Sequence, residues 1–420
     1  MTTFALRPYQ QAASDAAVAY LMNPKLKGRN GIIVQPTGGG KSLCLADIVT
    51  RLDGPSIVLQ PSKEILAQNA AKLASYGRRA AIFSASFGRR EIGAITLATI
   101  GSVVRHAEAF KDLPYVLIDE AHAMLSPKGG MYREFLDVVE HARICGLSAT
   151  PFRLATNMMG SELRFLTRTR PRVFRDVIHI TQIQELVSAG YWCPLEYRRV
   201  SAIDRSALKI NSTSADYTDK SVQQTLFAGG FVGRLVAEVE SLLAEGRKHI
   251  LVFTRFIDES RQLAQAIPGT AVVTSETPAD ERDAIVRDVR AGKIRVVSNV
   301  NCLALGFDFP ALDTVVLGGP TISLARYYQQ IGRAVRPHPS KAKAVIVDMV
   351  GLTDMFGHVE DLAIRASGKS GEQWAVHDGG GRQVTNVNMA ELAVDPAAAE
   401  KAIKNRRFWA KRAMAGTVDE

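Results

Sequence analysis

The stretch "GIIVQPTGGGKSLCLADIV", residues 31–49, decides how the fold of this chain begins. An apolar run of β-forming residues comes first, three glycines and a lysine follow, and an apolar helical pattern closes the stretch. A glycine-rich turn between a strand and a helix exposes successive backbone N–H groups at the helix N-terminus, where they bind phosphate oxygens. The stretch therefore predicts a strand, a phosphate-binding loop and a helix.

Single residues of this loop have predicted roles. Its glycines let the backbone approach a phosphate closely. Lys41 can reach the outer phosphates of a nucleotide, and the hydroxyl of Ser42 can bind Mg²⁺. Gln35 is a departure, because phosphate loops usually carry glycine at this position. The predicted nucleotide contacts of the loop are Thr37, Gly38, Gly39, Gly40, Lys41 and Ser42.

Composition sets broad limits on the class of protein. A chain of 420 residues with 46% hydrophobic residues is long enough for two to three domains. Its formal net charge of +10 favours a polyanionic partner such as nucleic acid, although a merely basic protein is the alternative. The four cysteines lack metal-knuckle spacing, and no signal pattern or apolar run of membrane length is present. We expect a cytoplasmic protein with reduced, buried thiols.

Short β-forming runs alternate with helical patterns along most of the chain. The first series holds the runs "SIVLQP", "AITLAT", "YVLIDE" and "RICGLSAT", with helical patterns at 41–52, 63–76 and 131–141. The second series has helical patterns near 231–245, 257–266, 279–291 and 323–334. Such alternation predicts an α/β fold with parallel sheets that helices cover on both faces.

The two series predict two α/β domains of similar size. We predict domain 1 at residues 1–165, a connecting segment at 166–225, domain 2 at 226–355 and a C-terminal extension at 356–420. Within the extension, "DGGGRQ" marks a break, and "DPAAAEKAIKNRRFWAKRA" predicts a short basic helix.

The stretch "YVLIDEAH", residues 115–122, is an apolar run that ends in adjacent carboxylates. A strand end beside the phosphate loop places Asp119 to hold Mg²⁺ and Glu120 to orient or deprotonate an attacking water. His122 is ambiguous by itself, since it could be an ordinary polar residue at the start of a loop. The loop and the acidic pair together favour an ATPase.

The set of motifs resembles the superfamily 2 helicases of the DEAH-box type over nearly all of residues 5–350. "LRPYQ" resembles the adenine-reading element, and "QPTGGGKS" and "IDEAH" resemble motifs I and II. The remaining matches, in chain order, are "LQPSKEILAQ" (59–68), "LATIGS" (97–102), "LSATPFR" (147–153), "HILVFTR" (249–255), "NVNCLALGFDFP" (299–310) and "QQIGRAVRP" (329–337). Together with "IQELVSAGYWCP", several of these are most similar to RadD-like and XPB/UvsW-like helicases.

The resemblance implies two RecA-like domains that use ATP and Mg²⁺. It implies that Gln10 contacts the base with support from Arg7. His122 completes motif II. Ser148 and Thr150 are implied to couple hydrolysis to movement, although "SAT" by itself is equally a turn at a strand end.

The second domain is implied to complete the nucleotide site. Arg333 and Arg336 lie three residues apart, so we expect them on one helix face, pointing across a cleft toward the γ-phosphate. Gln329 opens this motif. Gly306 and Asp308 match the nucleotide-side residues of motif V, where Ala304 and Leu305 replace the usual threonine and acid.

Nucleic acid is implied to lie across both domains. The implied contacts are Pro61, Ser62, Thr99, Ser102, Thr254 and Arg255. For Ser62 a plain helix cap is the alternative. The basic stretches 164–175 and 404–412 carry aromatic residues and are further candidates, unless their aromatics dock on the core.

Three functions are compatible with these motifs. The preferred one is an ATP-dependent helicase or translocase that moves on or remodels DNA, with DNA favoured over RNA by resemblance alone. The alternative is a duplex DNA translocase without strand separation, or the motor subunit of a larger DNA repair or defence assembly. A binding module with an inactive nucleotide site is disfavoured because Lys41, the acidic pair and both arginines are present. We expect no membrane contact and no zinc, since no cysteine follows Cys302, and a partner protein could bind the C-terminal extension.

Overall fold

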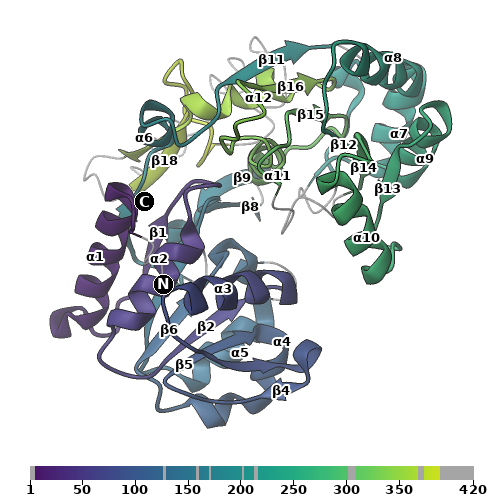
Figure 1. The fold of residues 1–420 in the computed structure, drawn as a ribbon. Coiled ribbons are helices and arrows are strands. Elements are labelled where there is room, and N and C mark those ends of the chain that lie inside the picture. The colour runs from purple at the N-terminus through teal and green to yellow at the C-terminus, as the bar shows by residue number, and fades with distance from the viewer. Residues whose placement is uncertain are drawn as a thin grey trace, which may run out of the picture. The chain divides into compact units, whose positions relative to one another are not determined.

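The computed structural model describes residues 5–125, 129–157, 160–169, 172–200, 203–211, 216–300, 309–367 and 373–387. These residues divide into two compact units. The first unit lies within residues 1–153, 165–192 and 366–374, and the second lies within residues 154–164, 193–365 and 375–420. Each unit is built on one large sheet, as Figure 1 shows.

The sheet of the first unit has eight strands in the order β10-β1-β7-β6-β2-β5-β3-β4. The strands are β1 (Gly31–Val34), β2 (Ser56–Gln60), β3 (Ala81–Ser84), β4 (Arg89–Arg90), β5 (Ile95–Thr99), β6 (Tyr115–Ile118), β7 (Arg143–Ser148) and β10 (Asp176–Ile180). All neighbours are parallel except β3 and β4, which form an antiparallel hairpin at the edge of the sheet. The carboxyl ends of the parallel strands therefore meet at one edge.

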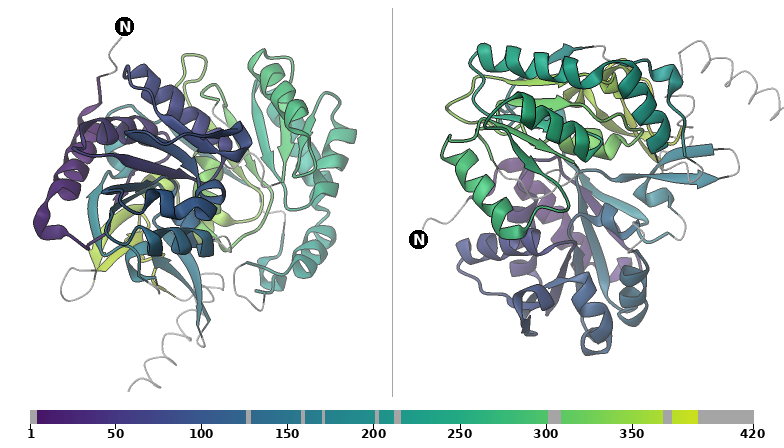
Figure 2. Two further views of the ribbon diagram at one scale, coloured as in Figure 1. Left: turned by 90° about the horizontal axis from the view of Figure 1, so that it is seen from below. Right: turned by 90° about the vertical axis from the view of Figure 1, so that its right-hand side faces the viewer.

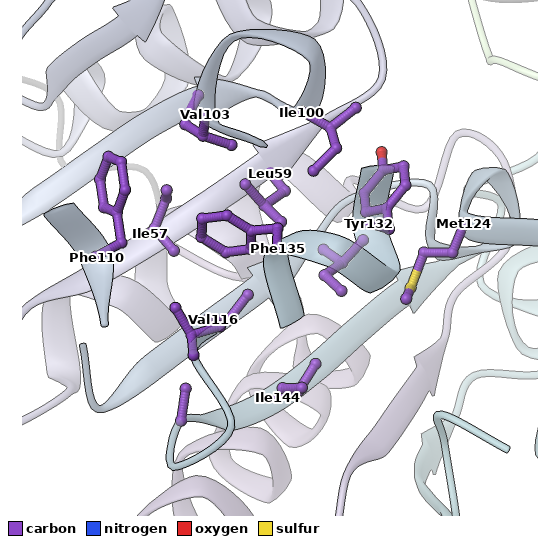
Figure 3. Packing of buried hydrophobic residues seen from close by; sticks show 14 of the residues in the cluster. Ile57, Leu59, Ile100, Val103, Phe110, Val116, Met124, Tyr132, Phe135 and Ile144 are labelled. Carbon is purple, nitrogen blue, oxygen red and sulfur yellow. The ribbon is translucent and has the colours of Figure 1, made fainter. Parts of the chain in front are cut away.

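Helices cover both faces of this sheet. Because successive strand residues point to opposite faces, Ile33 and Leu117 join one core cluster while Ile32 and Val116 join the other. The first cluster includes residues of α1 (Pro8–Met22), α2 (Lys41–Arg51) and α3 (Lys63–Ser75). The second, drawn in Figure 3, includes residues of α4 (Ile100–Val103), η3 (Val104–Phe110), η4 (Ala121–Leu125) and α5 (Gly129–Val138).

The sheet of the second unit has six strands, all parallel, in the order β11-β16-β15-β12-β14-β13. They are β11 (Leu195–Arg199), β12 (Ile250–Phe253), β13 (Ala271–Val273), β14 (Val296–Asn299), β15 (Thr314–Leu317) and β16 (Ala344–Asp348). The helices of this unit, coloured from teal through green to yellow-green in Figure 2, are α7 (Asp219–Ala228), α8 (Phe231–Ala244), α9 (Ile257–Ala266), α10 (Ala279–Arg290), α11 (Leu324–Ile331) and α12 (Leu352–Phe356).

Shorter elements complete the described chain. They are η1 (Pro24–Leu26), η2 (Ala85–Phe87), β8 (Phe152–Asn157), β9 (Gly160–Phe165), η5 (Leu166–Arg168), α6 (Ile183–Ser188), η6 (Arg205–Ala207), η7 (Val359–Asp361), β17 (Ala363–Ser367) and β18 (Gln373–His377). The predicted connecting segment 166–225 contains ordered structure: β10 is an edge strand of the first sheet, and β11 is an edge strand of the second.

The predicted α/β fold with parallel sheets is confirmed. Two helices end three residues before their predicted ends: the helix predicted at 131–141 ends at Val138, and the helix predicted at 323–334 ends at Ile331. Cys44, Cys145 and Cys193 are buried free thiols, and burial raises the pKa of Cys44 and Cys145 to about 12. Cys302 lies outside the described residues. Within the described ranges, no helix is both long enough and apolar enough to span a membrane.

Candidate functional site

Three sequence motifs meet at the carboxyl edge of the first sheet. Strand β1 lies beside β7, with Val34 opposite Ser148, and β7 lies beside β6, with Gly146 opposite Ile118. The phosphate loop, the "SAT" turn and the acidic pair follow directly after these three strands. This edge is where ligands bind in open parallel α/β sheets.

The phosphate loop needs its glycines. Gly38 and Gly40 have φ angles of 76° and 82°, in the left-handed region that favours glycine. At Gly39 an added Cβ would lie 2.9 Å from the carbonyl oxygen of Pro36, and at Gly40 it would overlap the amide of Gln10. Helix α2 begins at Lys41, so its N-terminal N–H groups lie at this turn.

Three buried side chains donate hydrogen bonds to the carbonyl oxygen of Gly39. The donors are Tyr9 Oη at 2.9 Å, Gln10 Nε2 at 2.8 Å and Gln35 Nε2 at 2.7 Å. A carbonyl oxygen repels phosphate, so holding this one on the protein side leaves N–H groups to face an anion. Gln35, the departure from the usual loop sequence, thus has a structural role that its residue type alone did not predict.

The segment that follows α6 also holds the loop. The indole Nε1 of Trp192 donates to the carbonyl oxygen of Thr37 at 3.1 Å. The ring of Tyr191 lies 5.6 Å from that of Tyr9, and the guanidinium carbon of Arg7 lies 3.9 Å from the centre of the Tyr191 ring. The sequence reasoning did not single out these aromatic residues, although "LRPYQ" and "GYWCP" contain them.

Gln10 is bound at both ends of its amide group. Its Oε1 accepts from the backbone N–H of Arg7 at 2.9 Å, while its Nε2 donates to Gly39. The element predicted to read adenine is therefore directly connected to the phosphate loop. Contact between Gln10 and a base stays a prediction.

Asp119 is a buried carboxylate with fixed partners. Its side chain is 3% exposed, and it accepts from Asn69 Nδ2 at 2.8 Å and from the backbone N–H of Glu120 at 2.9 Å. Burial, with the nearby Glu120 carboxylate, raises the pKa of Asp119 to about 6. A cation beside Asp119 would favour the charged form. Asn69, a buried polar residue of α3, was not predicted.

Glu120 has a strained backbone. Its φ of 49° lies in the left-handed region, which is uncommon for a residue with a Cβ and is typical of functional sites. Its Oε1 lies 3.4 Å from Lys41 Nζ, and its Oε2 lies 3.4 Å from His122 Nδ1. The structure therefore brings together the predicted general base, the phosphate-loop lysine and the last residue of motif II.

His122 connects motif II with motif III. Its Nδ1 lies 3.0 Å from the hydroxyl oxygen of Ser148 and 3.1 Å from that of Thr150. Burial lowers the pKa of His122, which favours the neutral imidazole. Ser148 Oγ also accepts from the backbone N–H of Thr150 at 3.1 Å. A displacement of either motif would therefore change the contacts of the other.

The donor set of this edge fits a nucleoside triphosphate with Mg²⁺. The glycine turn and Lys41 suit phosphate oxygens, and a carboxylate with a hydroxyl, Asp119 and Ser42, suits a hard cation. Within the described residues there is no group of three or more His, Cys, Asp or Glu side chains placed to hold a metal ion. Mg²⁺ bound with nucleotides typically takes one or two protein oxygens and completes its shell with phosphate and water.

The motif IV residues are bound within the second unit. Thr254 is 4% exposed, and its hydroxyl lies 2.7 Å from that of Ser260. Arg255 forms ion pairs with Asp216 at 2.9 Å and with Asp219 at 2.7 Å. Asp216, 7% exposed, also pairs with Arg326. In this structure both predicted nucleic-acid residues serve the packing of α7 and α9, and their contact with nucleic acid stays a prediction.

Arg333 and Arg336 do not lie on one helix face, so that prediction is wrong. Helix α11 ends at Ile331, and Gly332 caps it with its N–H bonded to the carbonyl oxygen of Tyr328 at 2.9 Å. The two arginines follow in turns. Both are half-buried, and burial lowers the pKa of Arg336. Gln329 lies on α11, and its backbone carbonyl accepts from Arg333 Nε at 3.4 Å.

Other predicted residues have varied positions. Ser62 caps α3 and accepts from the N–H of Ile65 at 3.4 Å, which supports the cap interpretation without excluding a phosphate contact; Pro61 precedes it. In the basic stretch 164–175, Phe165 and Phe174 are core residues, so these aromatic side chains pack in the protein interior. Gly306, Asp308 and the stretch 404–412 lie outside the described residues.

Comparisons with known proteins agree with this geometry. Residues 3–153 match the family model "Type III restriction enzyme, res subunit", and residues 234–338 match "Helicase conserved C-terminal domain". A "51.5 kDa protein" of a Lactococcus phage is 24% identical, covering 76% of this chain and 65% of its own length. "DNA 3'-5' translocase XPB2" of Sulfurisphaera tokodaii is 24% identical, covering 83% of this chain and 82% of its own length.

Two solved structures share the fold. One is the "ATP-dependent Type ISP restriction-modification enzyme LlaBIII bound to DNA", with a TM-score of 0.58, 18% identity and coverage of 83% of this chain and 28% of that one. The other is Dbp5 of S. cerevisiae bound to RNA and ADP BeF3, with a TM-score of 0.55, 16% identity and coverage of 82% and 88%. The chain spans between about half and two thirds of the length of the first curated relatives that it matches.

The two parallel sheets, the phosphate loop and the adjoining acidic pair define a protein of two RecA-like domains. The first domain carries the nucleotide-binding edge. The two family matches, one in each domain, and the relatives named as helicase or translocase are similarities that support a superfamily 2 helicase.

Proposed function

We propose that this protein is an ATP-dependent DNA helicase or translocase, which couples ATP hydrolysis to movement on or remodelling of DNA. The observation that carries the proposal is the bonded series from Lys41 through Glu120 and His122 to Ser148 and Thr150. It connects the residue nearest the expected phosphate to the motif expected to couple hydrolysis with movement. A mere nucleotide-binding module has no need of such a series.

Each residue of the edge has a defined task in this proposal. When bound, Mg²⁺ would supply positive charge that offsets the charge on the phosphates. Ser42 and Asp119 would hold this ion, and Asn69 fixes the Asp119 carboxylate. Lys41 supplies a second positive charge. Glu120 accepts a proton from the attacking water at a carboxylate oxygen, and His122 fixes the position of the Glu120 carboxylate.

Residues of the second domain complete the proposed site. Arg333 and Arg336 stabilise the charge that develops on the γ-phosphate, and Gln329 assists them. Gly306 and Asp308 contact the nucleotide from the same domain. Arg7 and Gln10 recognise adenine. Closure of the two domains on ATP would then link the nucleotide state to the grip on DNA.

DNA is favoured over RNA as the track. The XPB2 relative is named a DNA translocase, and one fold neighbour is bound to DNA, whereas Dbp5 is bound to RNA. Within the superfamily we place the chain with the DEAH-type, XPB-like and RadD-like proteins on its "IDEAH", "GRAVRP" and "GYWCP" stretches. A duplex translocase without strand separation, acting alone or in a larger repair or defence assembly, is the second candidate, and the similarity to the translocase XPB2 favours it.

The test is ATP turnover by the purified protein with a panel of cofactors: single-stranded DNA, duplex DNA and single-stranded RNA of equal length. We expect stimulation of about tenfold or more by DNA and none in Lys41→Ala. Stimulation by RNA alone would refute the choice of track, and stimulation by none of the three would refute the motor function. A strand-displacement assay then separates a helicase from a duplex translocase.

A further inference from the structure

The hairpin of residues 84–91 continues the row of predicted nucleic-acid contacts along the carboxyl edge of the first sheet. Strands β2, β5 and β3 are neighbours, with Gln60 opposite Thr99 and Phe83 opposite Ala98. The loop after β2 carries Ser62, helix α4 directly after β5 carries Ser102, and the turn of the hairpin follows β3. Figure 1 shows β4 at this margin of the sheet, near α4.

Hydrogen bonds fix the hairpin to the predicted contacts. The hydroxyl of Ser84 lies 3.1 Å from that of Thr99, and the hydroxyl of Ser102 accepts from the backbone N–H of Ala85 at 2.9 Å. Thr99 and Ser102 lie 2.9 Å apart through their own hydroxyls. The turn of the hairpin is therefore held in a fixed position beside two residues already expected to meet a phosphate backbone.

The exposed side chains of the hairpin suit a nucleic-acid strand. Phe87 is 40% exposed at the turn, which Gly88 closes with a φ of 62°. Arg89 and Arg90 are exposed, and among the described residues neither has an ion-pair partner. Guanidinium groups bind phosphate, and an exposed aromatic ring is a stacking surface for a base.

The two arginines point to opposite faces of the hairpin. Arg89 lies opposite Ser84, whereas Arg90 lies opposite Phe83, and cross-strand partners share a face. Ser84 bonds to Thr99 on its face, while Phe83 packs into the core cluster on the other. Arg89 is therefore on the side of the hydroxyl row, and Arg90 is not.

We propose that residues 84–91 form a nucleic-acid-binding hairpin in which Arg89 binds a backbone phosphate and Phe87 stacks on a base of a single DNA strand. The inference rests on the proposed function, since it assumes a DNA track. The row of predicted contacts otherwise offers only hydroxyl and N–H groups. The hairpin adds Phe87, a residue that contacts bases, to this row. Stacking requires an unpaired base, so Phe87 distinguishes a single strand from a duplex.

The experiment measures binding of the full chain to a fluorescein-labelled oligothymidylate and to a duplex of equal length, over a range of salt concentrations. We expect Arg89→Glu to weaken binding of both probes about tenfold and to reduce the single-strand salt slope by about 0.7. Arg79→Glu is the matched control: it makes the same charge change at the exposed residue before the other end of β3, and Kd should stay within about twofold. Arg90→Glu should weaken binding less than Arg89→Glu.

Phe87→Ala should weaken oligothymidylate binding at least about fivefold and leave duplex binding unchanged. Phe227→Ala, at an 88% exposed ring of the second unit, is its control and should change neither. If Arg89→Glu binds both probes with the same Kd and salt slope as the wild-type protein, the proposal of a nucleic-acid-binding hairpin is overturned. The proposed function is left intact by that result. A wild-type protein that binds neither probe and gains no turnover from DNA overturns the proposed function as well. Basal ATP turnover should be equal in all variants.

Discussion

The imidazole of His122 is bonded to the hydroxyl of Ser148, with 3.0 Å between Nδ1 and Oγ. His122 lies in η4, which follows β6, and Ser148 ends β7, so the bond connects the carboxyl ends of two neighbouring strands. The same imidazole lies 3.4 Å from the Glu120 carboxylate. A single ring therefore connects the "SAT" turn with the candidate site.

The first prediction concerns this connection. Replacing both hydroxyls, as in Ser148→Ala with Thr150→Ala, leaves the phosphate loop and acids in place, so basal ATP turnover should change by less than about threefold. The increase caused by DNA should fall about tenfold, which corresponds to about 1.4 kcal/mol of lost coupling. Steady-state turnover with and without DNA checks this. Ser75→Ala serves as control, and an unchanged DNA response in the double variant would contradict the coupling role.

The second prediction concerns Glu120. Glu120→Gln keeps the shape of the side chain but removes the proton acceptor, so turnover should fall at least about 100-fold while ATP still binds. Binding of a fluorescent ATP analogue, measured beside turnover, separates the two effects. The exposed Glu64→Gln should behave as wild type. Near-normal turnover in Glu120→Gln would assign the base to another residue.

The third prediction concerns Arg336. If this half-buried arginine meets the γ-phosphate, Arg336→Ala should lower kcat about 1,000-fold and change the Kd for the ATP analogue by less than about threefold. Single-turnover kinetics and equilibrium binding provide the two numbers. Arg261→Ala, an exposed arginine of α9, is the control. Retained turnover in Arg336→Ala would refute the contribution of the second domain at this position.

The fourth prediction concerns Gln35. Gln35→Leu keeps most of the volume but removes one of the three donors to the Gly39 carbonyl. The loss of one buried hydrogen bond, about 1 kcal/mol, should raise KM for ATP about fivefold with a smaller change in kcat. Gln11→Leu is the matched control, because Gln11 is an exposed residue of α1 whose side-chain amide donates to Asp15. Equal KM values for the two variants would show that the loop does not need this donor.

The fifth prediction concerns pH and the second unit. Glu259 is 7% exposed, and its Oε2 accepts from the backbone N–H groups of Arg255 and Phe256. Burial raises the pKa of Glu259 to about 7. The two N–H groups and the positive charge of Arg255 lower this pKa, and the negative charge of Asp258 raises it by a smaller amount. The folded state therefore binds the proton of Glu259 more tightly than the unfolded state does. The free energy of unfolding decreases as the pH rises toward and through about 7.

Glu259→Gln keeps an acceptor for both N–H groups without a buried charge. We expect it to be more stable than wild type by about 1–3 kcal/mol at pH 8, with the difference fading near pH 5. Urea unfolding at the two pH values measures this. A variant less stable at pH 8 would mean that the carboxylate charge itself is favourable there.

The sequence predicted most of the fold because two kinds of local signal were strong. Alternating apolar runs and helical patterns predicted parallel sheets, and the boundaries of α2, α3 and α9 agree closely with the structure. The pattern at 323–334 was misread because Gly332 stops the helix, while Ala334 and Val335 beyond it are buried and continue its apolar appearance. The edge strands in 166–225 were missed because each is short and partly exposed, so no apolar run marks it.

The candidate site was predicted in part for a similar reason. Lys41, Asp119 and Glu120 could be predicted because each lies in a short stretch of sequence that by itself indicates its role. The donors Tyr9, Asn69 and Trp192 were missed because a phenol, an amide or an indole in a sequence has no preferred partner until the chain folds.

By itself the sequence determined the two α/β domains, the phosphate loop and the acidic pair, since periodicity, glycine content and adjacent charges are local properties. Only the tertiary structure decided which residues serve them. It placed Gln35 and Tyr9 on one carbonyl, His122 between two motifs, and Ser84, the cross-strand partner of Arg89, on Thr99. These relations depend on strand order and register, which bring together residues that are 15 to 30 positions apart.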